Sequence, residues 1–112
     1  GIERMLALQG DMNGVEFIVE RGVTRPVWRP DTPGTAKIFA VAKDIAKELG
    51  FEMEGRSQGG GSDGNFTGAM GIPTLDSLGV QGAGLHTLQE HIRVESLTTR
   101  AKLMAGLLMR LM

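Results

Sequence analysis

Helical and extended segments alternate along most of this sequence, which predicts an α/β protein with a largely parallel sheet. Two amphipathic helices are the clearest elements, one between Pro33 and Gly50 and one over 97–112. Short apolar or alternating segments of strand length occur at 15–20, 51–54, 73–79 and 92–94. Such an alternation is typical of sheets whose parallel strands are joined by helices.

The helix between Pro33 and Gly50 has start and stop signals at both ends. Asp31 or Thr32 is suited to cap its N-terminus, and a proline suits the first turn. The glycine at position 50 suits a helix end. Apolar side chains recur along it at helical spacing: Ile38, Val41, Ala42, Ile45, Ala46 and Leu49. This pattern predicts a helix that packs on a sheet or on a neighbouring helix.

The helix over 97–112 is expected to begin at a cap formed by Glu95 or Ser96. Its predicted buried stripe consists of Leu97, Ala101, Met104, Leu107, Leu108 and Leu111. The abundance of methionine and leucine favours a core element or a contact between subunits over a cofactor-binding helix.

The first part of the chain has a different character. Residues 2–8 resemble the last turns of a helix, and 15–20 alternate as in a half-buried strand. The stretch 22–34 contains three prolines and no helical period, so an extended connector is expected there. We therefore expect the connector to separate a first part, residues 1–22, from a second part, residues 23–112.

The composition excludes several classes of protein. The 112 residues suit one domain of ordinary size, and the absence of cysteine excludes disulfide bonds and thiolate metal sites. A net charge of -1 gives no electrostatic reason to expect nucleic acid or a membrane as a partner. The polar start does not resemble a signal peptide. These features predict a soluble, cytoplasmic chain.

The run "GGGSDGN" at 59–65 precedes a predicted short helix over 63–70 and contains Gly59-x-Gly61-x-x-Gly64. This spacing formally matches a dinucleotide-binding fingerprint. However, the preceding "FEME" is short and polar, and no acidic residue follows at about 20 positions. The run also lacks the lysine that a P-loop requires. A tight turn that binds nothing is a second interpretation.

A third interpretation of this run is an anion site at the start of the short helix. Gly60, Gly61 and Ser62 would then present backbone N–H groups to a carboxylate or another anion. Asp63 would either cap the helix or hold a neighbouring group in place. Arg25, in "TRPVWRP", is a candidate partner for an anion, although a solvated basic connector explains it equally well.

His86 is the candidate metal ligand of this sequence. It lies in the loop "GAGLHTLQEH", where a neutral imidazole suits zinc or a similar metal. A single ligand does not make a site, because zinc needs three or four, and a lone loop histidine is more often a surface residue. His91 has a weaker case. Trp28, the single tryptophan, is expected to pack against the protein.

Three ordered motifs carry a resemblance to a known family. They are "GGGSDGN" at 59–65, "GIPTLDSLG" at 71–79 and "GLHTLQE" at 84–90, the last followed by a short strand and a helix. The chain resembles the C-terminal part of the zinc-dependent exopeptidases, which include glutamate carboxypeptidase, aminoacylase, acetylornithine deacetylase and succinyl-diaminopimelate desuccinylase. The wording "SDGNF" and "HTLQEHI" is most similar to the glutamate carboxypeptidase branch.

The resemblance implies a fold and a set of site residues. Residues 1–22 would be the last helix and strand of an α+β lid domain that dimerises, and 23–112 the C-terminal portion of a three-layer α/β/α catalytic domain. His86 matches the family's final zinc ligand. The substrate's carboxylate would meet Gly60, Gly61, Ser62 and, less directly, Arg25. Asp63 and Asn65 would order the loop.

The resemblance also implies a reaction, the hydrolysis of an amide or peptide bond next to a free carboxylate with two zinc ions. The family's other metal ligands and its catalytic glutamate have no counterpart in this sequence. No catalytic residue is therefore assigned, and the chain alone is expected to be inactive and to associate with other copies. The alternatives are a small module that binds a nucleotide or anion through Gly59–Gly64, and a non-catalytic interaction piece.

Overall fold

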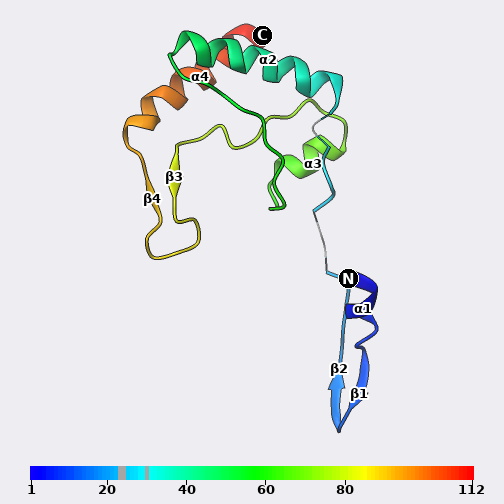
Figure 1. Ribbon diagram of the computed structural model, residues 1–112. Coiled ribbons are helices and arrows are strands. Elements are labelled where there is room, and N and C mark those ends of the chain that lie inside the picture. Colours follow the sequence, from blue (N-terminus) through cyan, green and yellow to red (C-terminus); the bar gives the residue numbers. More distant parts are fainter. Residues whose placement is uncertain (23–24, 30) are drawn as a thin grey trace.

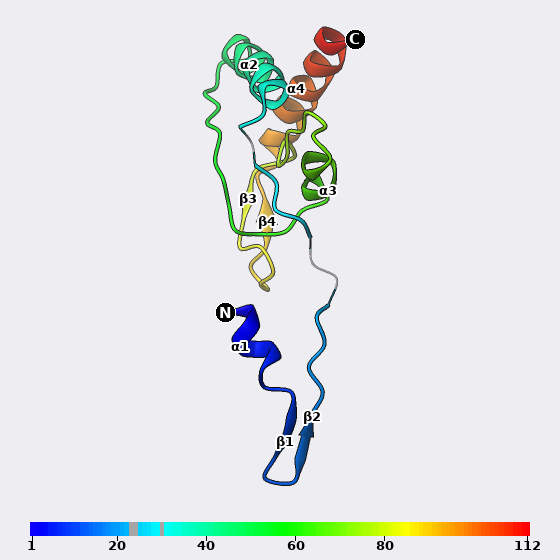
Figure 2. The same cartoon turned by 90° about the vertical axis from the view of Figure 1, so that its right-hand side faces the viewer.

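The computed structural model describes residues 1–22, 25–29 and 31–112. The chain is elongated, with extents of 64 × 36 × 19 Å and a radius of gyration of 19.6 Å, whereas a compact domain of this length has about 13 Å. Its N-terminal elements lie at one end and its two longest helices at the other (Figures 1 and 2). The predicted boundary between residues 22 and 23 falls beside residues outside this description and stays a prediction.

The N-terminal part consists of a short helix and a hairpin. Helix α1 (Ile2–Leu6) is followed by β1 (Gly10–Met12) and β2 (Val15–Phe17), which pair antiparallel. The two-residue turn is formed by Asn13 and Gly14, both at positive φ (55° and 78°). Strand β1 was not predicted, although Asn-Gly between two short segments is a strong hairpin signal.

Residues 15–20 were expected to form a half-buried strand. A strand is formed by Val15–Phe17, but the prediction that one of its faces is buried was wrong. Val15 and Phe17 lie on the same face of the strand because side chains alternate with a period of two, yet both are exposed, at 56% and 39%. A two-stranded hairpin with no layer packed on it buries little apolar surface. Strand β2 is therefore present without the covering that its alternation suggested.

Helix α2 (Pro33–Glu48) confirms the predicted start and stop signals. The Thr32 hydroxyl accepts a hydrogen bond from the Thr35 backbone N–H at 3.3 Å, so Thr32 rather than Asp31 is the cap. Gly50 adopts φ +82° directly after the helix, a conformation that favours glycine.

Helix α4 (Glu95–Leu111) packs along α2, and together they form the core. Figure 1 shows the two helices side by side at one end of the molecule. The fully buried cluster joins both helices through Ala42, Ile45, Leu103 and Leu107. An ion pair between Arg110 and Glu48 connects their ends, and this hydrogen bond raises the pKa of Arg110 above its ordinary value.

The predicted buried stripe of α4 was wrong apart from Leu107. The buried positions are Ser96, Leu103 and Leu107, whereas Leu97 and Leu108 remain exposed at 46% and 59%. Neither Glu95 nor Ser96 caps the helix, because no side-chain cap is formed and Ser96 bonds to Arg93 and Gln81 instead. Apolar residues occur on two faces of this helix, and packing on α2 selects one of them.

The predicted parallel sheet is not formed by the described residues. Segments 51–54 and 73–79 run without strand assignment, and the two described sheets are both two-stranded and antiparallel. Apolar side chains of these segments nevertheless pack against the helix pair: Phe51, Met53, Leu75 and Leu78. A segment becomes a strand only when a neighbour satisfies its backbone groups, and none does so here. The architecture is mixed α and β with small sheets.

Two further elements carry the predicted site. Helix α3 (Gly64–Ala69) follows the glycine run and ends before Gly71, close to its predicted bounds. Strands β3 (Gly82–Ala83) and β4 (His91–Ile92) form a second hairpin, and its loop contains His86. Residues of β3 were predicted to lie in a loop, and β4 was predicted to begin one residue later. Among the described helices, none combines the length and the apolar character that crossing a membrane requires.

Candidate functional site

The glycine run is held in place by the side chains that follow it. The Ser62 backbone N–H donates to the Asn65 side-chain oxygen at 2.8 Å, and the Gly64 N–H donates to the Ser62 hydroxyl at 3.1 Å. The Asn65 side chain also donates to the Pro26 carbonyl at 2.9 Å. Asn65 therefore orders the loop and ties it to the segment around residues 25–28.

Arg25 lies directly on the glycine run. Its guanidinium forms an ion pair with Asp63 at 3.5 Å. Its side chain passes so close to Gly61 that a Cβ at that position would lie 3.1 Å from the arginine Cδ. Of the two roles considered for Asp63, capping and holding a neighbour, the structure shows the second, because α3 has no side-chain cap.

Three of the four predicted carboxylate-binding residues line one cavity. Gly60, Gly61 and Ser62 line the same cavity, and Arg25 contacts the run from its side. The Ser62 backbone N–H is engaged by Asn65, so only its hydroxyl is available to a ligand. Within the described residues, Gly60 and Gly61 donate no backbone hydrogen bond.

Trp28 packs on the helix that follows the glycine run. Trp28 packs against α3 so closely that a Cβ on Gly68 would overlap the indole ring. This contact confirms that Trp28 packs on the protein. Its indole N–H is buried and has no hydrogen-bond partner among the described residues. Glycine at position 68 is therefore a requirement of the packing of the 25–28 segment on α3.

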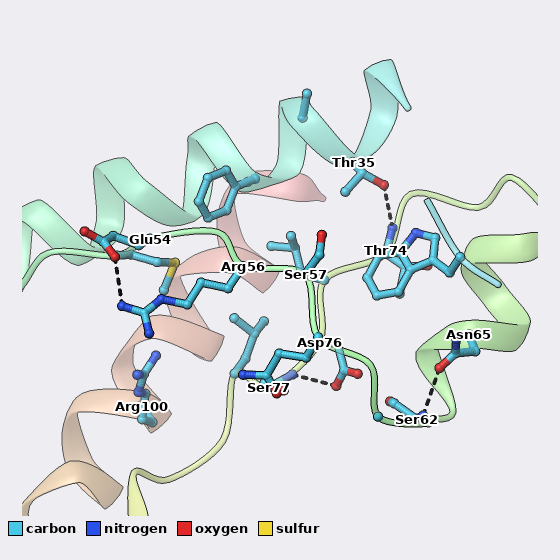
Figure 3. A pocket seen from close by; sticks show the side chains of 18 of the residues that line it. Thr35, Glu54, Arg56, Ser57, Ser62, Asn65, Thr74, Asp76, Ser77 and Arg100 are labelled. Atoms are coloured by element: carbon cyan, nitrogen blue, oxygen red, sulfur yellow. Dashed lines mark hydrogen bonds and ion pairs between the residues drawn. The ribbon is translucent and has the colours of Figure 1, made fainter. Parts of the chain in front are cut away.

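The cavity beside the glycine run has a volume of about 640 Å³ and lies between α2, α4 and the extended segments (Figure 3). Apolar side chains are among the residues that line it, including Phe39, Phe51 and Leu75. Two arginines at its edge are already engaged: Arg56 pairs with Glu54 at 3.1 Å, and Arg100 lies over the Phe51 ring at 5.4 Å. The predictions did not include these arginines, since no sequence spacing connects them.

His86 lies in the β3–β4 loop and does not line this cavity. Its backbone adopts φ +64°, a left-handed conformation that is uncommon for a residue with a side chain. Its backbone N–H donates to the Glu90 carboxylate at 3.2 Å. The described residues thus do not bring the predicted metal ligand and the predicted carboxylate site into one pocket.

No complete metal site is formed by the part of the chain that the structure describes, because no three His, Cys, Asp or Glu side chains gather there. The His91 ring bonds through Nδ1 to the Gln89 carbonyl at 2.8 Å. The His86 imidazole makes no hydrogen bond to another described residue.

Comparison with known proteins assigns the family. The sequence pattern of peptidase family M20/M25/M40 matches residues 14–110, which covers the glycine run, α3 and the His86 loop. The chain belongs to the peptidase family M20/M25/M40. This finding confirms the resemblance on which the site residues were predicted.

Two curated relatives match over most of the chain. A succinyl-diaminopimelate desuccinylase of Thioalkalivibrio sulfidiphilus (strain HL-EbGR7) is 33% identical over 75 residues, 67% of this chain and 20% of the relative. The uncharacterized protein YqjE of Bacillus subtilis (strain 168) is 32% identical over 72 residues, 64% of this chain and 19% of the relative. The chain thus matches about one fifth of the length of these relatives. No solved structure matches it.

Proposed function

We propose that this chain forms part of a metal-dependent hydrolase that cleaves an amide or peptide bond next to a free carboxylate. The observation that carries the proposal is the family match over residues 14–110. The relative named a desuccinylase supports removal of an acyl group, and the wording of two motifs favours a substrate like that of glutamate carboxypeptidase. By the same reasoning, residues 1–22 belong to a lid domain and 23–112 to a three-layer catalytic domain.

The proposed carboxylate site uses the glycine run and Arg25. The backbone N–H groups of Gly60 and Gly61 and the Ser62 hydroxyl are suited to donate to a substrate carboxylate. Arg25 lies beside them, and a hydrogen bond from its guanidinium to a carboxylate is charge-assisted and therefore stronger than one between neutral groups. Asp63 keeps the guanidinium against the run when no substrate is bound.

The proposed metal ligand is His86, which would hold zinc together with ligands from outside this chain. A pair of bound zinc ions polarises an amide carbonyl and lowers the pKa of a bound water. The exposed imidazole of His86 fits this role, since no described residue bonds to it. With a single ligand, the isolated chain is expected to be inactive.

The nucleotide alternative for Gly59–Gly64 has less support. A pyrophosphate needs glycines so that the backbone can approach it closely. Here the Arg25 side chain lies against Gly61, and Asn65 engages the next backbone N–H. Both contacts favour a small anion bound beside Arg25 over a nucleotide that displaces it.

To test the proposal, the complete reading frame that encodes this chain is expressed. Hydrolysis of N-acyl amino acids by the product is then measured with added zinc and with a chelator. We expect zinc-dependent hydrolysis that His86→Ala lowers by about 100-fold or more in kcat/KM, because a lost metal ligand removes several kcal/mol of transition-state stabilisation. His91→Ala is the matched control and is expected to retain activity. Equal activity of the two variants, or hydrolysis that is insensitive to the chelator, contradicts the proposal.

A further inference from the structure

His86 is one of three residues other than glycine that the described chain holds at positive φ, with Asn13 and Ser77. Asparagine tolerates this conformation in a tight turn, as Asn13 does in the first hairpin. Histidine occurs in the left-handed region more often than most residues, yet the conformation remains uncommon for it and depends on contacts that hold the backbone. The direction of the His86 Cα–Cβ bond therefore depends on the contacts that fix its backbone.

The Glu90 carboxylate provides that contact. Its Oε2 accepts the His86 backbone N–H at 3.2 Å, and no other hydrogen bond to His86 occurs among the described residues. The remaining bonds of the loop hold other positions. Thr87 donates through both its N–H and its hydroxyl to the Gly84 carbonyl, and the Gln89 N–H donates to the Thr87 hydroxyl.

The backbone of Glu90 is held by a hydrogen bond, and its side chain extends back across the loop. Its own N–H donates to the Thr87 carbonyl at 3.2 Å, and the next residue, His91, pairs with Ala83 in the β3–β4 ladder. The two sides of the loop approach closely at Gly84, where a Cβ would lie 2.8 Å from the Gln89 carbonyl oxygen. The base of the loop is therefore narrow, and the Glu90 carboxylate lies within reach of residue 86.

We propose that Glu90 is a positioning residue for His86. Its carboxylate holds the His86 backbone in the left-handed conformation and so directs the imidazole toward the metal. The inference rests on the proposed function for the metal, whereas its conformational part concerns this chain alone. Outer-shell partners of metal-binding histidines usually bond to the ring, but this one acts through the backbone.

The conformational part is tested by NMR on the chain itself. At φ near +60° the amide hydrogen lies close to its own Hα, which gives a strong intraresidue NOE. We expect Glu90→Ala to weaken this NOE at His86 and to speed exchange of its amide hydrogen by about threefold to tenfold, the change that one ordinary hydrogen bond supports. Leu88→Ala, at a fully exposed position of the same loop, is the control and leaves both readouts unchanged.

Glu90→Gln separates positioning from direct metal binding. Its amide oxygen still accepts the His86 N–H, so we expect the NOE and the exchange rate to stay near those of the wild type. If Glu90 were itself a metal ligand, Glu90→Gln would weaken zinc binding, because a neutral amide replaces a carboxylate. Unchanged amide resonances of α2 and α4 in all variants show that the fold is retained.

The metal part is tested in the complete protein. We expect Glu90→Ala to raise the zinc concentration for half-maximal hydrolysis by about 10-fold to 100-fold, and Glu90→Gln to restore it. An unaltered His86 NOE in Glu90→Ala, or an unaltered zinc requirement, overturns the positioning role while the wild type still hydrolyses substrate. Absence of zinc-dependent hydrolysis in the wild type instead overturns the proposed function and, with it, positioning toward a metal.

Discussion

Gly68 shows how one residue in a short helix decides the position of a distant segment. Alanine is normally preferred to glycine inside a helix by about 0.5–1 kcal/mol. Here the space that a Cβ would fill is occupied by the Trp28 indole. Trp28 packs against Gly68 of α3 in the segment that also carries Arg25, so this contact supports the candidate site.

We therefore predict that Gly68→Ala destabilises the packing of Trp28 by about 1–3 kcal/mol, since overpacking outweighs the gain in helix propensity. Trp28 is the single tryptophan, so its fluorescence reports the change directly, as a red shift on exposure to water. Gly59→Ala is the control, because nothing lies within 4 Å of the added Cβ. A blue-shifted or unchanged spectrum in Gly68→Ala contradicts the prediction.

At the scale of the element, helix α4 has apolar side chains on two faces, of which α2 covers one. Leu103 is fully buried, whereas Leu108 is exposed on the other face. Gly106 allows the close approach, since a Cβ there would lie 3.0 Å from the Ile45 side chain. The sequence pattern alone could not distinguish the two faces, because both follow the helical period.

These two leucines form a matched pair of variants. We predict that Leu103→Ala costs about 2–5 kcal/mol of unfolding free energy, because it leaves a cavity between α2 and α4. Leu108→Ala removes the same atoms from an exposed site and is expected to change stability by about 0.5 kcal/mol or less. Chemical denaturation followed by circular dichroism measures both. A larger loss in Leu108→Ala would support the predicted stripe over the observed one.

At the scale of the whole molecule, the chain exposes far more surface than a compact protein. Its accessible area is 9185 Å², whereas a folded monomer of 12.0 kDa exposes about 6,000 Å². The uncovered face of α4 is spaced in the pattern that pairs helices in coiled coils, through Leu97, Ala101, Met104, Leu108 and Leu111. We propose that, in the isolated chain, a second copy covers that face.

Sedimentation velocity over a wide concentration range tests this association. We predict dimers or larger oligomers for the wild type and a monomer for the double variant Met104→Lys, Leu108→Lys, whose charges would be buried in the interface at high cost. Leu88→Lys places a charge on the exposed hairpin loop and is expected to leave the oligomer intact. A monomeric wild type at every concentration overturns the proposal.

Helices α2, α3 and α4 could be predicted from the sequence alone, because periodicity, the threonine cap of α2 and the glycines after α2 and α3 act locally. The family could also be predicted from the sequence, because its motifs are contiguous in the chain, whereas the roles of the site residues stay predictions. The hairpins were recoverable only in part: Asn13-Gly14 was a signal that went unused, whereas the two-residue strands β3 and β4 are too short for a pattern.

Tertiary structure decided which face of α4 is buried, where Arg25 and Trp28 lie, and that 51–54 and 73–79 remain without ladder partners. It also decided that Glu90 holds the backbone of His86. The physical reason is common to all of these. Burial, strand pairing and close backbone contact are properties of two segments together, so neither segment specifies them until its partner is in place.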